Sequence, residues 1–290
     1  MVTRRCTQRQ FLLRPDRETN NAVLYCLAVA AQRYQIDVLD FVQMSNHLHE
    51  VIYDRHGNAP AFYEHFHKLL AKCMNALRGR WENFFSSEQV CVVRLETREA
   101  LIDKLVYIAT NPVKAGLVER VADWPGASGY HALVDGIELR ATRPRHFFSK
   151  NGSMPKEVSM TLRIPPELGD HDTIVAAVRA RVEAVEKHEA RKRAESGKRV
   201  LGRYAVLRQS WRDSPTSREP RRNLRPTFVA RSIWTFLERA RRKRDWQEAY
   251  RRARLRLLAG ESVTFPRGTY WLCRFVGVAV TSVASLQENN

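Results

Sequence analysis

Two histidine pairs stand out as residues that could do chemistry. His47 and His49 lie in the run HLHEVIY, whose pattern is typical of a β-strand, so both imidazoles are expected on one face of that strand. Their Cα atoms would be about 7 Å apart, close enough for both rings to bind one metal ion. The alternative is a pair of hydrogen-bonded strand histidines. His65 and His67 lie in a helical run, where residues two apart point about 200° away from each other, so that pair is not expected to chelate.

A tyrosine and an asparagine form a second candidate group. Tyr107 precedes Asn111 by four residues near the end of a predicted helix, so the two side chains share a helix face. A phenol and an amide oxygen could then meet one ion. The alternative is that Tyr107 packs in the core while Asn111 caps the helix before Pro112.

Two segments resemble signatures of a known family. The run Met44-Ser45-Asn46-His47-Leu48-His49 resembles the Met-Pro-Asn-His-hydrophobic-His signature of the IS200-like, single-tyrosine (HUH) transposases, which include the REP-associated tyrosine transposases. The run YIATNPVKAGLV, from Tyr107 to Val118, is similar to the second signature of the same family, and Trp124-Pro125 follows it. The resemblance covers residues 1–135.

This resemblance implies a fold, an ion and a reaction. The fold is α+β, with an antiparallel sheet flanked by helices (a ferredoxin/RRM-like HUH nuclease core). His47, His49 and Asn111 would hold Mg²⁺ or Mn²⁺, and Tyr107 would be the catalytic nucleophile. The implied activity is DNA nicking and strand transfer at hairpin-associated sites such as REP elements, through a 5′-phosphotyrosine in single-stranded DNA. Because a phenol of pKa near 10 is a weak nucleophile at neutral pH, a nearby cation would assist it.

The chain departs from the family pattern at three places. Ser45 stands where the family usually has proline, and Gly126-Ala127-Ser128 departs from its usual residues after Trp-Pro. Glu50 stands where the family usually has an apolar residue, and on a strand it should point away from the two histidines. None of these departures removes a reacting group.

The predicted elements place the motifs in a compact α+β domain. Strands are expected at Arg5–Leu13, Ile36–Gln43, His47–Tyr53 and Gln89–Leu95, and helices at Asn20–Tyr34, Ala59–Trp81 and Thr97–Thr110. Thr19 or Asn20 is the expected cap of the first helix. The second and third strands are so close in sequence that a hairpin through Met44-Ser45-Asn46 is expected to join them.

The charge balance indicates a polyanionic partner, expected to be single-stranded or hairpin DNA. The chain has 49 Lys and Arg against 31 Asp and Glu, a net charge of +18 and a pI near 10.2. Residues 1–150 contain 20 basic and 16 acidic residues, whereas residues 151–290 contain 29 and 15. The candidate nucleic-acid-binding residues are Arg4, Arg5, Lys114, Arg191, Lys192, Arg193, Arg221, Arg222, Arg241, Arg242, Lys243 and Arg244.

Three segments are expected along the chain. Residues 1–135 would form the nuclease domain, residues 136–171 a linker region, and residues 172–290 a basic, mainly helical extension that binds nucleic acid. The extension resembles that of some longer family members in the runs VLGR, SREPRR and FPRGTYW, which imply no role. Its aromatic residues could stack on unpaired bases or fill a core, and the apolar run Thr269–Val280 could complete that core.

Several function classes are excluded or remain open. No apolar run approaches the roughly 18 residues of a membrane span, and the first residues do not resemble a secretory leader, so a cytoplasmic, nucleoid-associated protein is expected. Five scattered cysteines argue against a disulfide framework. The alternatives to a transposase are a domesticated, non-cleaving protein that binds DNA or RNA, and a metal phosphoesterase that uses water while Tyr107 is structural. A homodimer and a monomer both remain possible.

Overall fold

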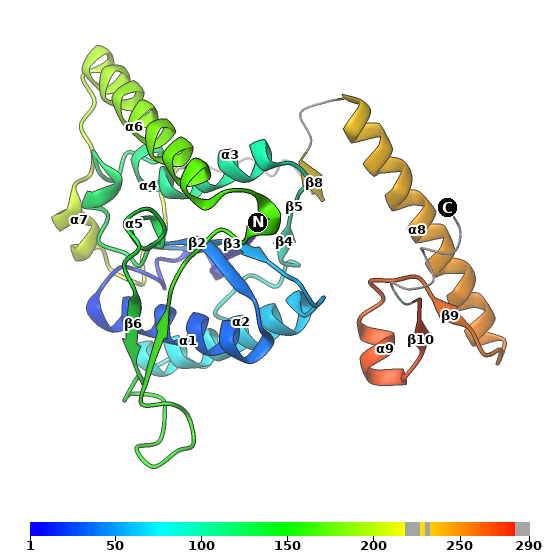
Figure 1. Ribbon diagram of the computed structural model, residues 1–290. Coiled ribbons are helices and arrows are strands. Elements are labelled where there is room, and N and C mark those ends of the chain that lie inside the picture. Colours follow the sequence, from blue (N-terminus) through cyan, green and yellow to red (C-terminus); the bar gives the residue numbers. More distant parts are fainter. Residues whose placement is uncertain (218–226, 230–232, 282–290) are drawn as a thin grey trace. The chain divides into compact units, whose positions relative to one another are not determined.

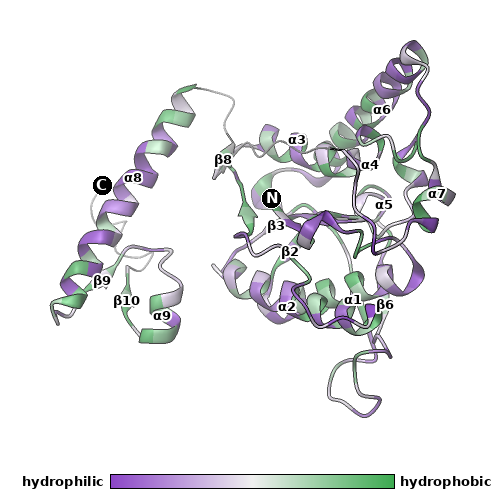
Figure 2. Cartoon of the chain, turned by 180° about the vertical axis from the view of Figure 1, so that it is seen from behind, coloured by the Kyte–Doolittle hydropathy of each residue, from purple (hydrophilic) through white to green (hydrophobic). Residues whose placement is uncertain are grey.

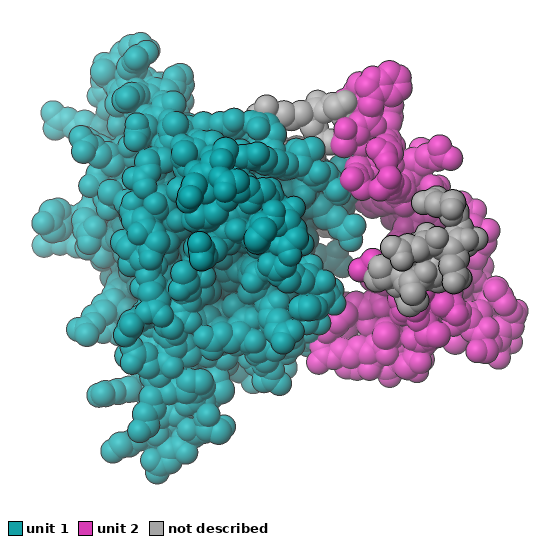
Figure 3. All heavy atoms as spheres, in the orientation of Figure 1, with its two compact units in different colours: residues 1–229 teal, residues 230–290 magenta. Residues whose placement is uncertain are grey.

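The chain forms two compact units. The computed structural model describes residues 1–217, 227–229 and 233–281; unit 1 comprises residues 1–229 and unit 2 residues 230–290 (Figure 1 and Figure 3). Each unit is described by itself below. Among the described helices, none has the length and apolar character needed to cross a membrane.

Unit 1 is built on a four-stranded antiparallel sheet. Its strands, in the spatial order β2-β3-β1-β4, are β2 (Asp37–Met44), β3 (His47–Tyr53), β1 (Val2–Arg5) and β4 (Cys91–Val92). Thr3 and Val42 lie opposite His49 on the two neighbouring strands, so these three side chains share one face. Phe41 lies opposite Glu50, and both point to the other face. The predicted α+β class, with an antiparallel sheet flanked by helices, is confirmed.

Helices cover both faces of this sheet (Figure 1 and Figure 2). The face that carries Glu50 is covered by α1 (Arg17–Tyr34) and α2 (Ala59–Arg78). The histidine face is covered by α3 (Arg98–Ala109) and α5 (Tyr130–Val134), and α6 (His171–Ser196) packs on these two helices. The expected cap of α1 at Thr19 or Asn20 is wrong. The helix starts three residues earlier, because the carboxylate of Asp16 accepts a hydrogen bond of 2.7 Å from the Thr19 amide.

The first strand is shorter than the predicted Arg5–Leu13. β1 ends at Arg5, where it lies opposite His47, the first residue of β3, so the ladder with β3 stops there and Cys6 forms only an isolated bridge to Phe85. The chain then turns through Gln8 and Arg9, whose φ angles are 49° and 58°. The fourth predicted strand is divided into β4 and β5 (Arg94–Leu95). The residue between them, Val93, forms backbone hydrogen bonds with Met1 instead of continuing a single strand.

Residues beyond 135 contribute to the core of unit 1. The hairpin of β6 (Leu139–Thr142) and β7 (Glu157–Met160) packs on α1. On α6 the apolar residues are spaced four apart, and Ile174, Val178 and Val182 are each no more than 2% exposed. The compact units therefore differ from the predicted segments 1–135, 136–171 and 172–290. The reason is the apolar stripe formed by Ile174, Val178 and Val182. Charged residues dominate the composition of α6, so the composition alone did not indicate that this helix packs in the core.

Three short elements complete unit 1. These are α4 (Asn111–Lys114), α7 (Arg203–Arg208) and β8 (Phe228–Val229). Val206 of α7 is fully buried, so this part of the chain also belongs to the core. The strand β8 pairs in parallel with β5.

Unit 2 has a small core. It contains α8 (Ile233–Leu258), β9 (Thr264–Phe265), α9 (Trp271–Val276) and β10 (Ala279–Val280), and β9 and β10 pair in parallel. Phe265 is fully buried, and the ring of Tyr250 lies 5.5 Å from it. The expectation that Thr269–Val280 completes this core is wrong for the aromatic residues of α9. Trp271 and Phe275 are 50% and 65% exposed, because one side of this single short helix faces solvent.

Candidate active site

The two histidines of β3 meet on one face of the sheet, as predicted. The ring centroids of His47 and His49 are 4.7 Å apart, and the rings are nearly perpendicular, at 84°. In contrast, His65 meets the Tyr34 ring edge to face, whereas His67 lies against other residues of the core. The second pair therefore does not converge, which confirms the prediction from helix geometry.

Each histidine ring is oriented through its Nδ1 atom. Nδ1 of His47 lies 2.7 Å from the amide oxygen of Asn46, and Nδ1 of His49 lies 2.8 Å from the hydroxyl oxygen of Thr3. Because an amide oxygen can only accept, Nδ1 of His47 carries the proton and Nε2 carries the lone pair. Thr3 can likewise accept from Nδ1 of His49. Both rings can thus present Nε2 as a ligand atom, with the other nitrogen held by a partner, as is usual for metal-binding histidines.

Burial keeps both imidazoles neutral. It lowers the pKa of His47 to about 4, with a smaller contribution from the charge of Arg5. Burial also lowers the pKa of His49 well below its ordinary value, and the charges of His47 and Lys104 act in the same direction. Because only a neutral imidazole has a lone pair for a cation, both rings are ready to bind one at neutral pH.

Tyr107 lies beside this histidine pair. Its ring centroid is 5.5 Å from that of His49, and its side chain is 37% exposed. Nδ2 of Asn111 lies 3.2 Å from Nε2 of His49, and the Asn111 amide is near enough to the phenol to influence its pKa. The structure therefore places Tyr107 at the surface beside the histidines. The alternative prediction, that Tyr107 packs in the core, is wrong. Asn111 connects the tyrosine to the histidine pair.

Two lysines flank the tyrosine ring. The Nζ atoms of Lys104 and Lys114 lie 5.2 Å and 5.9 Å from the ring centroid of Tyr107. Lys114 is one of the predicted nucleic-acid-binding residues. Lys104 was missed, although its position three residues before Tyr107 on a helix was a usable signal. Both ammonium groups place positive charge beside the ring, where it can attract phosphate.

The environment of Tyr107 acts on its pKa in two directions. Burial raises the pKa above its ordinary value, while the hydrogen bond from Asn111 acts to lower it. The net shift is upward. The protein alone thus leaves this phenol protonated at neutral pH, and a cation near the hydroxyl would be needed to reverse that.

The donor atoms fit a divalent cation that keeps open positions. The set comprises two neutral imidazole nitrogens and, after rotation of the Asn111 amide by 180°, one carboxamide oxygen. In the described part of the chain, no cluster of three or more His, Cys, Asp or Glu side chains could hold a metal ion. Because the three donors carry no charge, phosphate oxygens would have to neutralise the ion, and imidazole nitrogen suits Mn²⁺ better than Mg²⁺.

A neighbouring helix fixes the helix that carries Tyr107. Arg181 of α6 forms ion pairs with Glu99 and Asp103 of α3, at 3.0 Å to the latter. Because α3 is attached to α6 both by these pairs and by the apolar stripe, the tyrosine is carried on a rigid element.

Glu50 points away from the histidines, as expected. It lies on the face covered by α2, and its Oε1 atom is 3.9 Å from Nε2 of His67. Both side chains are buried. Glu50 therefore takes no part in the candidate active site.

The predicted basic residues lie at several separate places. Arg5 shares the face of His47, whereas Arg4 points to the other face, where its guanidinium lies over Phe85. The triplet Arg191, Lys192 and Arg193 lies near the end of α6, and Arg241, Arg242, Lys243 and Arg244 lie on α8. Arg221 and Arg222 lie outside the described residues. Within the described part of unit 1, Arg5 lies opposite His47 on the neighbouring strand, and Lys114 lies beside the Tyr107 ring.

Fold and site together define an α+β protein whose antiparallel sheet presents a histidine pair to a tyrosine on an adjacent helix. No family model matches the chain, and no curated protein matches it. Among solved structures, the chain is similar to a REP-associated tyrosine transposase bound to a REP hairpin. The two are 18% identical with a TM-score of 0.38, and the match covers 51% of this chain and 80% of that chain. The sequence motifs resemble the same family.

Proposed function

We propose that this protein is a metal-dependent, single-stranded DNA endonuclease and strand transferase of the transposase type. The observation that carries the proposal is the geometry around Asn111. Its amide lies 3.2 Å from Nε2 of His49, and the Tyr107 ring packs at 5.5 Å from the His49 ring, so a phosphate bound at the histidines would lie next to the tyrosine.

Each residue has a defined part in the proposed reaction. The Tyr107 oxygen attacks the phosphorus of a DNA phosphodiester, its proton passes to water, and the bond to the 3′-oxygen breaks. The products are a 5′-phosphotyrosine and a free 3′-hydroxyl group, which takes its proton from water. Lys104 and Lys114 bind the phosphate and stabilise the phenolate. His47, His49 and Asn111 would hold Mn²⁺ or Mg²⁺, which would polarise the phosphate and stabilise its developing charge.

A surface of unit 2 supports DNA binding. Residues 233–281 contain eleven basic and four acidic residues. The exposed rings of Trp271 and Phe275 are nearly parallel, at 12°, with centroids 5.4 Å apart, and the Arg274 guanidinium lies 5.2 Å from the Phe275 ring. Exposed aromatic rings beside arginine are typical of surfaces that stack unpaired bases. We therefore assign the binding of single-stranded DNA in part to this aromatic surface, defined as Trp271, Arg274 and Phe275.

A covalent-adduct assay tests the proposed chemistry. Hairpin-bearing single-stranded oligonucleotides from the flanks of the gene, labelled at the 5′ or the 3′ end, are incubated with Mn²⁺ or Mg²⁺ and run on a denaturing protein gel. The full chain should form a metal-dependent adduct with the 3′-labelled fragment, and Tyr107→Phe and His47→Ala should form none. Tyr34→Phe, on α1, is the matched tyrosine control and should behave as wild type.

Two other outcomes would favour the alternative functions. Cleavage that persists in Tyr107→Phe would indicate a phosphoesterase that uses water. Tight binding without an adduct, across several flanking substrates and both metals, would indicate a non-cleaving nucleic-acid-binding protein, for which the basic character of unit 2 is the supporting observation.

A further inference from the structure

A segment far along the sequence contacts both motif-bearing parts of the candidate active site. We call residues 201–217 the strap. At its start, the amide of Leu201 donates to the carbonyl of Gly116 at 2.8 Å, just after the segment that contains Asn111. Further along, the carbonyl of Asp213 accepts from the amide of Phe11 at 2.8 Å. The strap thus runs from the tyrosine motif to the chain segment that lies against the histidine hairpin.

We call the hairpin of β2 and β3 the histidine hairpin. The backbone conformation of its turn is not one that favours a two-residue hairpin by itself. Ser45 and Asn46 alone connect Met44 to His47, and neither has a positive φ angle. The two-residue turns that match the twist of paired strands require a positive φ at one or both residues. Contacts from outside the hairpin must therefore stabilise this turn.

Those contacts come from two segments. The amides of Leu13 and Cys6 donate to the carbonyls of Ser45 and Asn46, at 2.9 Å and 2.8 Å. The third contact is from the strap: the Ser45 hydroxyl donates to Oε1 of Gln209 at 3.3 Å. Ser45 is only 5% exposed, so water competes little for this hydrogen bond.

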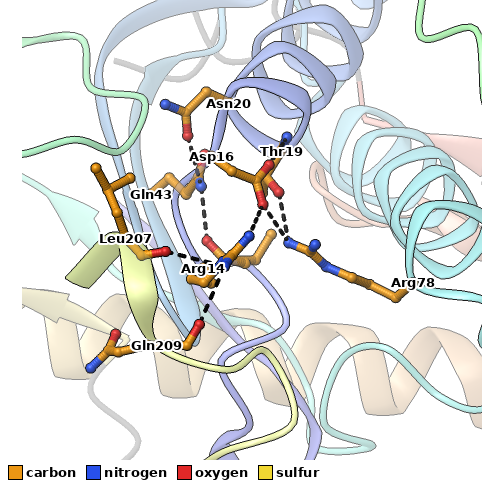
Figure 4. A network of polar contacts seen from close by, with 9 residues as sticks. Arg14, Asp16, Thr19, Asn20, Gln43, Arg78, Leu207 and Gln209 are labelled. Carbon is orange, nitrogen blue, oxygen red and sulfur yellow. Dashed lines mark hydrogen bonds and ion pairs between the residues drawn. The ribbon is translucent and has the colours of Figure 1, made fainter. Parts of the chain in front are cut away.

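Gln209 is itself held in place by a partly buried network (Figure 4). Nη1 of Arg14 donates to the carbonyls of Leu207 and Gln209, at 3.1 Å and 3.4 Å. Nη2 of Arg14 pairs with Asp16 at 2.7 Å, and Arg78 pairs with the same carboxylate oxygen at 3.1 Å. The network therefore anchors the strap to the start of α1 and the end of α2.

We propose that Gln209 is a positioning residue for His47, and that the strap is part of the catalytic unit rather than of a DNA-binding extension. Gln209 holds Ser45, the backbone continues to Asn46, and the Asn46 side chain orients the ring of His47 at 2.7 Å. The catalytic role of this path rests on the proposed function.

The test combines Gln209→Ala with Ser45→Pro in the full chain. Proline favours the negative φ that residue 45 already has, and within residues 1–217 the Ser45 amide donates to no backbone carbonyl. Proline should therefore stabilise the turn without the strap. Gln32→Ala, which removes a glutamine that bonds to Ser159 of β7, is the matched control.

Two measurements are made on each variant. Gln209→Ala should speed hydrogen exchange of the Asn46 and His47 amides about fivefold and slow adduct formation by a similar factor, with unchanged oligonucleotide affinity. Ser45→Pro in the Gln209→Ala background should restore both values, and Gln32→Ala should change neither. Unchanged exchange at Asn46 and His47 in Gln209→Ala would overturn the inference, as would a lost adduct that Ser45→Pro does not rescue. If wild type forms no adduct, the proposed function fails, and the exchange measurement alone decides the role of the strap.

Discussion

In unit 1 the residues around the candidate active site are fixed by buried contacts, whereas in unit 2 most large apolar and basic side chains face solvent. The buried residues in the described part of unit 2 are Ala253, Phe265 and Thr269. Covalent chemistry needs side chains held to within a fraction of an ångström, which a packed core provides. Binding a flexible polyanion needs exposed charges and rings instead. Under the proposed function, catalysis would therefore belong to unit 1 and contacts with unpaired bases to unit 2.

The largest expected effect comes from shortening unit 1 to the 135 residues that carry the motifs. Residues 1–135 should show no cooperative thermal unfolding and no adduct, because α6 and its stripe, Ile174, Val178 and Val182, are lost from the core. Residues 1–229 should show both. Circular dichroism and the adduct assay provide the two readouts, and a cooperative, active 1–135 fragment would contradict the assignment of α6 to this core.

Two isoleucine-to-alanine variants, one in each unit, compare how much a buried and an exposed side chain contribute to stability. Ile174→Ala should lower the free energy of unfolding of unit 1 by about 2–5 kcal/mol, because the removed side chain is fully buried. Ile233→Ala in unit 2 should change stability by no more than about 0.5 kcal/mol, since Ile233 is 63% exposed. Urea denaturation measures both. If the two variants lost equal amounts of unfolding free energy, Ile233 would have to be buried in solution.

The aromatic surface should contribute to affinity differently from the charges of α8. The double variant Trp271→Ala and Phe275→Ala should weaken binding of single-stranded DNA by about 1–3 kcal/mol without changing the dependence on salt. Arg241→Gln with Arg242→Gln should instead make that dependence less steep. Fluorescence anisotropy at several salt concentrations separates the two. Trp81→Ala, which removes an 88% exposed tryptophan of unit 1, is the control.

The last effect depends on pH and comes from a buried carboxyl in unit 1. Burial raises the pKa of Asp40 well above its ordinary value, and its Oδ2 atom has no hydrogen-bond partner. The folded state thus holds a proton that the unfolded state releases, so this group stabilises the fold at low pH and loses that contribution as pH rises above about 4. Relative to wild type, Asp40→Asn should gain up to about 1.4 kcal/mol per pH unit above that value. A pH-independent difference in unfolding free energy would contradict this.

The local parts of the site could be predicted from the sequence. Alternation along the strand placed His47 and His49 on one face, and helix periodicity placed Tyr107 near Asn111. The parts of the site that could not be predicted depend on contacts between residues far apart in the sequence. Thr3 meets His49 only because of the register between β1 and β3, and no local pattern indicates that register. The role of Gln209 could not be predicted either, because it is one polar residue in a basic segment that the composition separates from residues 1–135.

The parallel pair of β5 and β8 has a mechanical consequence. β8 is the last described segment of unit 1, and β5 ends two residues before Thr97, whose side chain caps the helix of Tyr107. If unit 2 binds DNA as proposed, a force on that DNA would be transmitted to unit 1 at this two-residue ladder, which is next to the N-terminus of α3. Tension on a bound strand would thus load the tyrosine helix along the backbone, and an optical-trap assay could measure how adduct reversal depends on that force.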